Sequence, residues 1–133
     1  MKLRLSLVAF CLLFVTFAIG QNKLPNVSLK GLDNKSINIA NYNSSSKPVI
    51  VSFWATWCGP CKMLTPVFES LSKELSHEVS FAKVDIDRSL EVAQRYDIVS
   101  VPTVVLFKDG VEVDRIVGFL PKEQIKTKIK AHI

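Results

Sequence analysis

The chain has 133 residues, of which 48% are hydrophobic and 22% are charged, and its formal net charge is +5 at pH 7. This length, with only 5 glycines and 6 prolines, predicts one globular core and excludes a disordered or fibrous chain. The positive charge is modest and no nucleic-acid-binding motif or interleaved aromatic residues accompany the lysines, so nucleic acid is not expected as a partner.

The first twenty residues have the pattern of an export signal. Two basic residues lie within the first four positions, an almost continuous apolar run follows, and Ala18-Ile19-Gly20 supplies small residues where a signal peptidase reads the chain. We therefore expect residues 1–20 to be a cleaved signal peptide and the protein to be exported, either periplasmic or secreted. The alternative is an uncleaved segment that tethers the protein to a membrane, but the apolar run is short for a span of about 20 residues.

Export would leave two cysteines in the mature protein. Cys11 lies within the apolar run and would leave with the signal, so that Cys58 and Cys61 remain. Lipid modification of Cys11 is not favoured, because bulky Phe10 precedes it and the apolar run continues past it. The mature chain can then form one internal disulfide, across two intervening residues.

Residues 21–47 read as an N-terminal extension. Apolar residues alternate loosely on both sides of a turn at 31–34, and the stretch 41–47 is polar and rich in serine. The pattern predicts a short hairpin, with strands around 27–29 and 37–39, followed by a surface connection.

Residues 48–133 form the main predicted domain. The apolar run 48–54 is typical of a strand covered on both faces, and apolar residues at helical spacing then predict a helix that ends near Ser76 and is kinked at Pro66. Further along, the pattern predicts a strand at 79–86, a short helix at 89–95, strands at 103–107 and 111–117 around an Asp109-Gly110 turn, and a final helix that carries lysines. This order describes an α/β sheet with helices on both faces.

Cys58 lies where the buried strand ends and the helix begins. Its sulfur should lie near unpaired backbone N–H groups and the positive end of the helix dipole, which stabilise a thiolate. Pro60 is tolerated in a first helical turn, and Gly59 is expected to give the backbone room to turn close to the sulfur. Cys61 follows on the same helix face, further from the exposed tip. We therefore expect Cys58 to attack a substrate disulfide and Cys61 to resolve the mixed disulfide.

Three other roles for the cysteine pair are less favoured. A structural disulfide across two residues closes a loop too short to constrain the unfolded chain much. A zinc site needs about four ligands, and His77 and His132 are not spaced as metal ligands, so we expect no metal. Inert buried cysteines do not fit the start of a helix with a flanking Gly-Pro pair.

The segment FWATWCGPCK at 53–62 resembles the active-site segment of the thioredoxin family. Further similarity lies in KVDID, Val101-Pro102-Thr103, FKDG and VGFLPK, the last three within 101–122. The residues before Asn41, with FWATWCGPC, are similar to exported thioredoxin-like reductases of the TlpA type. The resemblance implies a thioredoxin fold, a central mixed β-sheet flanked by helices on both faces, here with a short N-terminal β-hairpin extension.

The resemblance also implies a substrate site around the cysteines. Pro102 should be a cis-proline that faces them. Trp57, Val101, Pro102 and Gly118 should line a shallow groove for an extended substrate segment, with Val101 offering backbone hydrogen bonds. Trp54 is expected in the core.

Ser52 departs from the family pattern. In thioredoxins this position normally carries a buried aspartate beneath the second cysteine, paired with the lysine that Lys83 matches. A buried carboxylate has a raised pKa and can accept the proton of Cys61, whereas serine cannot do so near neutral pH. We therefore expect the resolving step to lack its usual base.

These observations predict an exported thiol-disulfide oxidoreductase that reduces disulfides in protein substrates, as a monomer and without a bound cofactor. The Gly-Pro pair between the cysteines resembles the reducing members of the family. Because an oxidising compartment would exhaust such a dithiol, a membrane electron donor is implied. The alternatives are a disulfide oxidase or isomerase of the same fold, and a non-catalytic binding module on the same scaffold.

Overall fold

The computed structural model describes residues 23–32, 34–43 and 45–133, and the predicted signal peptide with Cys11 lies outside these ranges. The strands are β1 (Ser28–Gly31), β2 (Ser36–Asn38), β3 (Val49–Trp54), β4 (Ser80–Asp85), β5 (Thr103–Lys108) and β6 (Val111–Val117). The helices are the 3-10 helix η1 (Ile39–Tyr42) and the α-helices α2 (Gly59–Glu74), α3 (Leu90–Arg95) and α4 (Lys122–Lys130). None of the helices in the described ranges has the length and apolar character that a membrane span requires.

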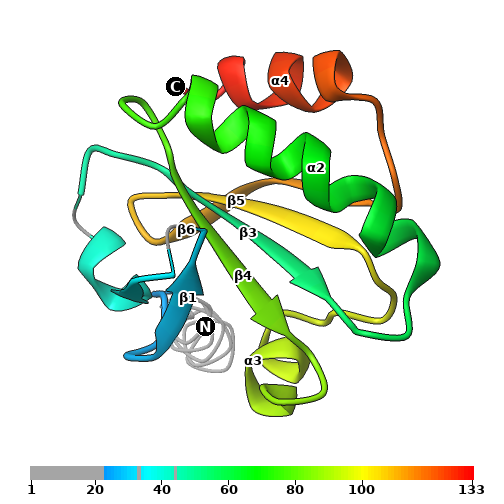
Figure 1. Ribbon diagram of the computed structural model, residues 1–133. Helices are drawn as coiled ribbons and strands as arrows, with labels where there is room; N and C mark the ends of the chain where they lie inside the picture. Colours follow the sequence, from blue (N-terminus) through cyan, green and yellow to red (C-terminus); the bar gives the residue numbers. More distant parts are fainter. Residues whose placement is uncertain (1–22, 33, 44) are drawn as a thin grey trace, which may run out of the picture.

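The six strands form one mixed sheet in the order β2-β1-β4-β3-β5-β6 (Figure 1). Strands β3 and β4 are parallel, because α2 carries the chain back across the sheet between them, and the other neighbouring pairs are antiparallel. Helices α2 and α4 lie on one side of the sheet and α3 lies near the opposite side (Figure 1). The predicted thioredoxin fold is confirmed, with element ends that differ from the expected ones by no more than two residues.

Strand β3 is buried on both faces, as its continuous apolar sequence predicts. Ile50 packs in the cluster beneath α2 and α4, which includes Phe68 and Ile125. Its neighbours Val51 and Phe53 point to the other face and join the cluster under α3 and the N-terminal extension. The strand therefore holds its carboxyl end, and the cysteine that follows, in a fixed place.

Helix α2 continues through Pro66 and ends at Glu74, two residues earlier than expected. It is joined to α4 by ion pairs at its carboxyl end. Glu74 contacts both Lys126 and Lys122, the latter at 3.0 Å, and Lys130 lies 2.6 Å from the carboxylate of Glu78. Three lysines of α4 thus have acidic partners on α2 or on the turn that follows it.

The N-terminal hairpin adds to the sheet beside β4, and η1 follows it. This 3-10 helix was not expected, because four residues are too few to show helical periodicity. The Asn38 side chain caps it by accepting the backbone N–H of Ala40 at 3.0 Å. The Asn43 side chain then fixes the start of the described chain, since it accepts the N–H of Leu24 at 2.7 Å and donates to its carbonyl at 3.0 Å.

Candidate active site

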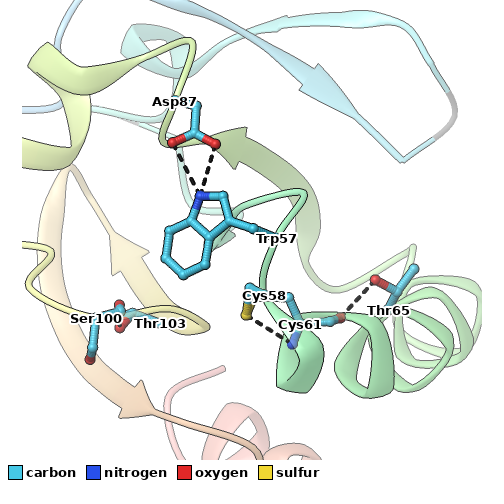
Figure 2. Close-up of a disulfide and its surroundings, with 7 residues drawn as sticks. All are labelled: Trp57, Cys58, Cys61, Thr65, Asp87, Ser100 and Thr103. Atoms are coloured by element: carbon cyan, nitrogen blue, oxygen red, sulfur yellow. Dashed lines mark hydrogen bonds between the residues drawn. A yellow bond between two sulfur atoms is a disulfide. The ribbon is translucent and has the colours of Figure 1, made fainter.

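Cys58 and Cys61 form a disulfide at the start of α2, where β3 has just ended. The S–S distance is 2.08 Å and the two Cα atoms are 5.3 Å apart. Cys58 is the N-cap residue of the helix, and its Sγ accepts the backbone N–H of Cys61 at 3.1 Å (Figure 2). Pro60 lies in the first helical turn, as expected. The sulfur of Cys58 therefore lies at the helix end whose free N–H groups favour negative charge.

The two cysteines are almost equally buried in this oxidised state, with 3% of Cys58 and 4% of Cys61 exposed. The expected difference in exposure is therefore wrong for the disulfide form. Both form a buried cluster with Ala55, and Trp54, Ile86 and Val101 pack against it. What distinguishes the two sulfurs here is the helix N-terminus rather than access to solvent.

Gly59 lies between the two cysteines without a positive φ. Beyond its two chain neighbours and the backbone of its own helix, a Cβ atom at this position would meet no atom within 4 Å. The expected need for space next to the Cys58 sulfur stays a prediction, because Cys58 is one of those chain neighbours. The residue lies at the exposed start of the helix, where a side chain would point into open space.

The Val101–Pro102 peptide bond is cis, as the resemblance implies. Val101 packs against the two cysteines, and the carbonyl of Pro102 accepts the N–H of Gly118 at 2.8 Å. Gly118 has φ of 85°, a conformation that favours glycine. The start of β5 and the end of β6 are thereby tied together next to the disulfide. The Thr103 hydroxyl adds a bond to the carbonyl of Ser100 at 2.8 Å within the loop that faces Cys58 (Figure 2).

Trp57 extends from the loop before Cys58 and is 69% exposed. Its indole N–H donates to the carboxylate of Asp87, with Nε1 3.1 Å from Oδ2 and 3.5 Å from Oδ1 (Figure 2). Sequence reasoning did not assign Asp87 a role, although it is the last residue of the KVDID similarity. A large apolar ring is thus held in a fixed direction at the protein surface.

Further exposed apolar residues lie next to the predicted groove residues. Val99 comes shortly before Val101, and Val117 and Phe119 flank Gly118. We refer to these exposed apolar residues, with Trp57, as the apolar rim, which is the set Trp57, Val99, Val117 and Phe119. The sequence pattern did not point to Val99 and Phe119, since exposure of single apolar residues is common and carries no signal of its own.

Ser52 is 6% exposed and lies directly opposite Lys83 in the parallel register of β3 and β4. Lys83 Nζ is 5.9 Å from the centroid of the Trp54 ring, a distance at which a cation and an aromatic face attract each other. Trp54 is half-buried rather than a core residue, because it is the last residue of β3, where it packs against the cysteine cluster and its ring lies near Lys83. The structure thus brings Ser52 and Lys83 together, and the serine supplies no titratable group there.

No group of three or more histidine, cysteine, aspartate or glutamate side chains that could hold a metal is found in the part of the chain that the structure describes. His132 instead lies 3.4 Å from a carboxylate oxygen of Asp114, and His77 is exposed at the turn after α2.

Comparisons with known proteins agree with this arrangement. The family model described as Thioredoxin matches residues 33–131. A thioredoxin of Mycobacterium tuberculosis (strain ATCC 25618 / H37Rv) is 55% identical over 75 residues, which are 56% of this chain and 65% of that protein. A thioredoxin of Staphylococcus saprophyticus is 43% identical over 91 residues, 68% of this chain and 88% of that protein.

Among solved structures, that of Fasciola hepatica thioredoxin is similar, with a TM-score of 0.64 and 42% sequence identity. The similarity covers 70% of this chain and 86% of that one. The chain spans slightly less than two thirds of the length of the mycobacterial relatives that it matches.

Proposed function

We propose that this chain, which belongs to the thioredoxin family, is a thiol-disulfide oxidoreductase that reduces disulfides in other proteins. The observation that carries the proposal is the Cys58–Cys61 disulfide at the N-terminus of α2. A thiolate at this position is stabilised by the helix end, and its partner is already within bonding distance.

The reaction begins with the reduced dithiol. The Cys58 thiolate attacks one sulfur of the substrate disulfide, the substrate S–S bond breaks, and the departing sulfur takes up a proton. The Cys61 thiol then loses its proton and attacks the Cys58 sulfur, which releases the second substrate thiol. The substrate gains two electrons and two protons in total, and the protein is left with the Cys58–Cys61 disulfide, so no bound cofactor is required.

The surface around the disulfide supports a polypeptide substrate. Val101, which precedes the cis-proline, packs against the cysteine cluster, and the residues of the apolar rim lie within two positions of Cys58, Val101 or Gly118 in the chain. Exposed apolar side chains suit the side chains of an extended segment. We assign Trp57, Val101, Pro102 and Gly118 to this contact surface. Val101 would offer its backbone groups to the substrate chain, a mode of binding that requires no particular substrate side chain.

We further propose that the protein is exported and acts as a monomer, as a member of the TlpA-type reductases. The support is the signal-like pattern of residues 1–20 and the similarity of the segment before Asn41. A reductant in an oxidising compartment needs a supply of electrons, so a membrane electron donor is part of this proposal. Exported protein should begin at Gln21, whereas a full-length chain retained in membranes would support a tethered form.

A catalytic reduction assay tests the proposed activity. A disulfide-bonded substrate protein is incubated with a small excess of dithiothreitol. This thioredoxin-family protein is then added in an amount well below that of the substrate. We expect many turnovers per molecule, and none for Cys58→Ser. Stoichiometric binding without turnover would indicate a binding module, and faster oxidation of a reduced protein than reduction of its disulfide would indicate an oxidase.

A further inference from the structure

A cleft of about 460 Å³ lies near the carboxyl end of β3, where the chain leads on to the cysteine pair. One wall is the hairpin strand β1, and the other walls are the carboxyl ends of β3 and β4 with the loop that leads to α3. Figure 1 shows β1 alongside β4, which places the N-terminal extension at this edge of the sheet. The volume is within the range of sites that hold small ligands or parts of larger ones, which is about 300 to 1,000 Å³.

The charged residues of the cleft are mostly cationic. Lys30 and Lys83 are direct partners in the antiparallel register of β1 and β4, and Arg88 contributes a third cation from the loop before α3. Asp85 is the one carboxylate among the described lining residues, and it lies 3.7 Å from Arg88, whose side chain is 88% exposed. Like charges placed directly opposite each other on a sheet are unfavourable, so the lysine pair favours an anion in the cleft.

The cleft is connected to the disulfide through Trp54. Its side chain lines the cleft and also packs against Cys58 and Cys61. Thr56 is another lining residue, and it precedes Cys58 by two positions. The nearby carboxylate of Asp87 is engaged by the indole N–H of Trp57 and is not among the lining groups. Trp54 is thus the side chain that the cleft and the cysteine cluster share.

We propose that this cleft binds carboxylate side chains that flank the reactive cysteine of the substrate, so that acidic disulfide substrates are preferred. The inference rests on the proposed disulfide reduction and adds the class of substrate. An extended chain advances about 3.3 Å per residue, so an acidic residue a few positions from the attacked cysteine can reach a neighbouring site. The cleft focuses the field of its cations, which raises the local concentration of such a segment.

The test uses three disulfide-bonded peptides that differ only at two residues beside the cysteine, which are glutamate, glutamine or lysine. For each, kcat/KM of the full protein is measured at ionic strengths of about 0.01 M and about 1 M, where the screening length is about 30 Å and about 3 Å. An exposed ion pair changes an affinity by up to about five-fold. We therefore expect the glutamate peptide to exceed the glutamine peptide about three- to ten-fold at low salt, the lysine peptide to be slowest, and the differences to vanish at high salt.

Variants identify the cleft as the source of the preference. Lys30→Gln with Arg88→Gln should remove the preference and leave kcat/KM for the glutamine peptide unchanged, and Lys30→Glu should favour the lysine peptide. Lys73→Gln is the control for the loss of a positive charge outside the cleft, since it removes one charge, as each substitution in the cleft does, from an exposed residue in the last turn of α2. It should keep the preference in full.

Two results would overturn the inference alone. One is equal kcat/KM for the glutamate and glutamine peptides at low salt. The other is that the preference does not depend on the cleft, either because it survives in the Lys30→Gln, Arg88→Gln double variant or because Lys73→Gln loses it equally. Failure to reduce any of the three peptides would instead refute the proposed disulfide reduction, and this inference with it.

Discussion

Ser52 on β3 lies directly opposite Lys83 on β4, so a hydroxyl stands next to this lysine where thioredoxins are expected to carry a carboxylate. The serine is 6% exposed and borders the strand end from which the cysteine loop departs. Because a serine hydroxyl does not accept a proton near neutral pH, the Cys61 thiol has no side-chain base at this position.

The first prediction is that Ser52→Asp speeds the resolving step. A carboxyl buried at this place has a raised pKa and can take the proton of Cys61 near neutral pH. Resolution of a preformed Cys58 mixed disulfide should become about ten-fold faster or more, within the range of general-base effects. The initial attack by Cys58 should change less. Single-turnover kinetics across pH measure both steps.

The matched control is Ser52→Asn, which adds a polar group of similar size that does not titrate. It should leave the pH dependence of resolution unchanged. Both variants should lower the free energy of unfolding, by about 1–3 kcal/mol if the new group finds no partner. An unaltered resolution rate in Ser52→Asp would mean that proton removal does not limit this step.

The second prediction concerns the bond between Trp57 and Asp87. Asp87→Ala frees the exposed indole, so substrate binding should weaken and KM should rise about three- to ten-fold with little change in kcat. Asp87→Asn keeps an acceptor oxygen and should stay within about two-fold of the unsubstituted protein. Steady-state kinetics with a protein disulfide measure the effect, and equal KM values for all three forms would show that the bond does not orient a binding surface.

The third prediction compares two glycines. Gly110 has φ of 78°, and a Cβ there would collide with the Asn43 side chain that holds Leu24. Gly110→Ala should lower the free energy of unfolding by about 2–4 kcal/mol, from the disfavoured φ and the displaced side chain together. Gly59→Ala, whose Cβ meets nothing within 4 Å beyond its chain neighbours and its own helix backbone, should leave stability unchanged or raise it by up to about 1 kcal/mol. Urea unfolding of the oxidised proteins compares them, and similar losses in both would contradict the distinction.

The fourth prediction is that the free energy of unfolding depends on pH through the ion pairs between α2 and α4. The hydrogen bond from Lys126 lowers the pKa of Glu74, with further lowering by Lys122. A carboxyl with a lowered pKa stabilises the folded state above its ordinary pKa of 4.5, and this contribution is lost as the pH falls through the lower folded value. Glu74→Gln should therefore be the less stable protein at neutral pH and should approach the unsubstituted protein on acidification.

Glu69→Gln is the control for this effect, since Glu69 lies on the exposed face of the same helix and makes no ion pair within the described ranges. Urea unfolding at pH values between about 3 and about 7 tests the prediction. If the free energies of unfolding of Glu74→Gln and the unsubstituted protein differ by the same amount at every pH, the ion pairs do not cause the difference. The effect should be small, because the groups are exposed.

Local sequence patterns predict the features of the structure that depend on neighbouring residues in the chain. The apolar run of β3 predicts its burial on both faces, and the start of a helical period after Trp57 places Cys58 at a helix N-terminus. Both depend on residues that are neighbours in the chain. The prediction that the Val101–Pro102 bond is cis rests on the family resemblance, because cis is the minority state for a proline judged from its sequence alone.

The rest depends on contacts between distant segments. Asp87 meets Trp57 across 30 residues, and no periodicity links the two positions. Lys30 joins Lys83 through the register of β1 on β4, which the hairpin sequence does not specify. The burial of Cys58 likewise depends in part on Val101, which packs against the cysteine cluster from the loop before β5.

The division of labour between the two cysteines is tested most directly by the covalent intermediate. Reduced Cys61→Ser and Cys58→Ser proteins are each mixed with a disulfide-bonded substrate, and adducts are assigned by mass spectrometry of peptide digests. We predict that Cys61→Ser accumulates a one-to-one mixed disulfide on Cys58, because nothing resolves it, and that Cys58→Ser forms none at a comparable rate. An adduct on Cys61 that forms as fast in Cys58→Ser, or no adduct in either protein, would contradict the assignment of Cys58 as the attacking thiol.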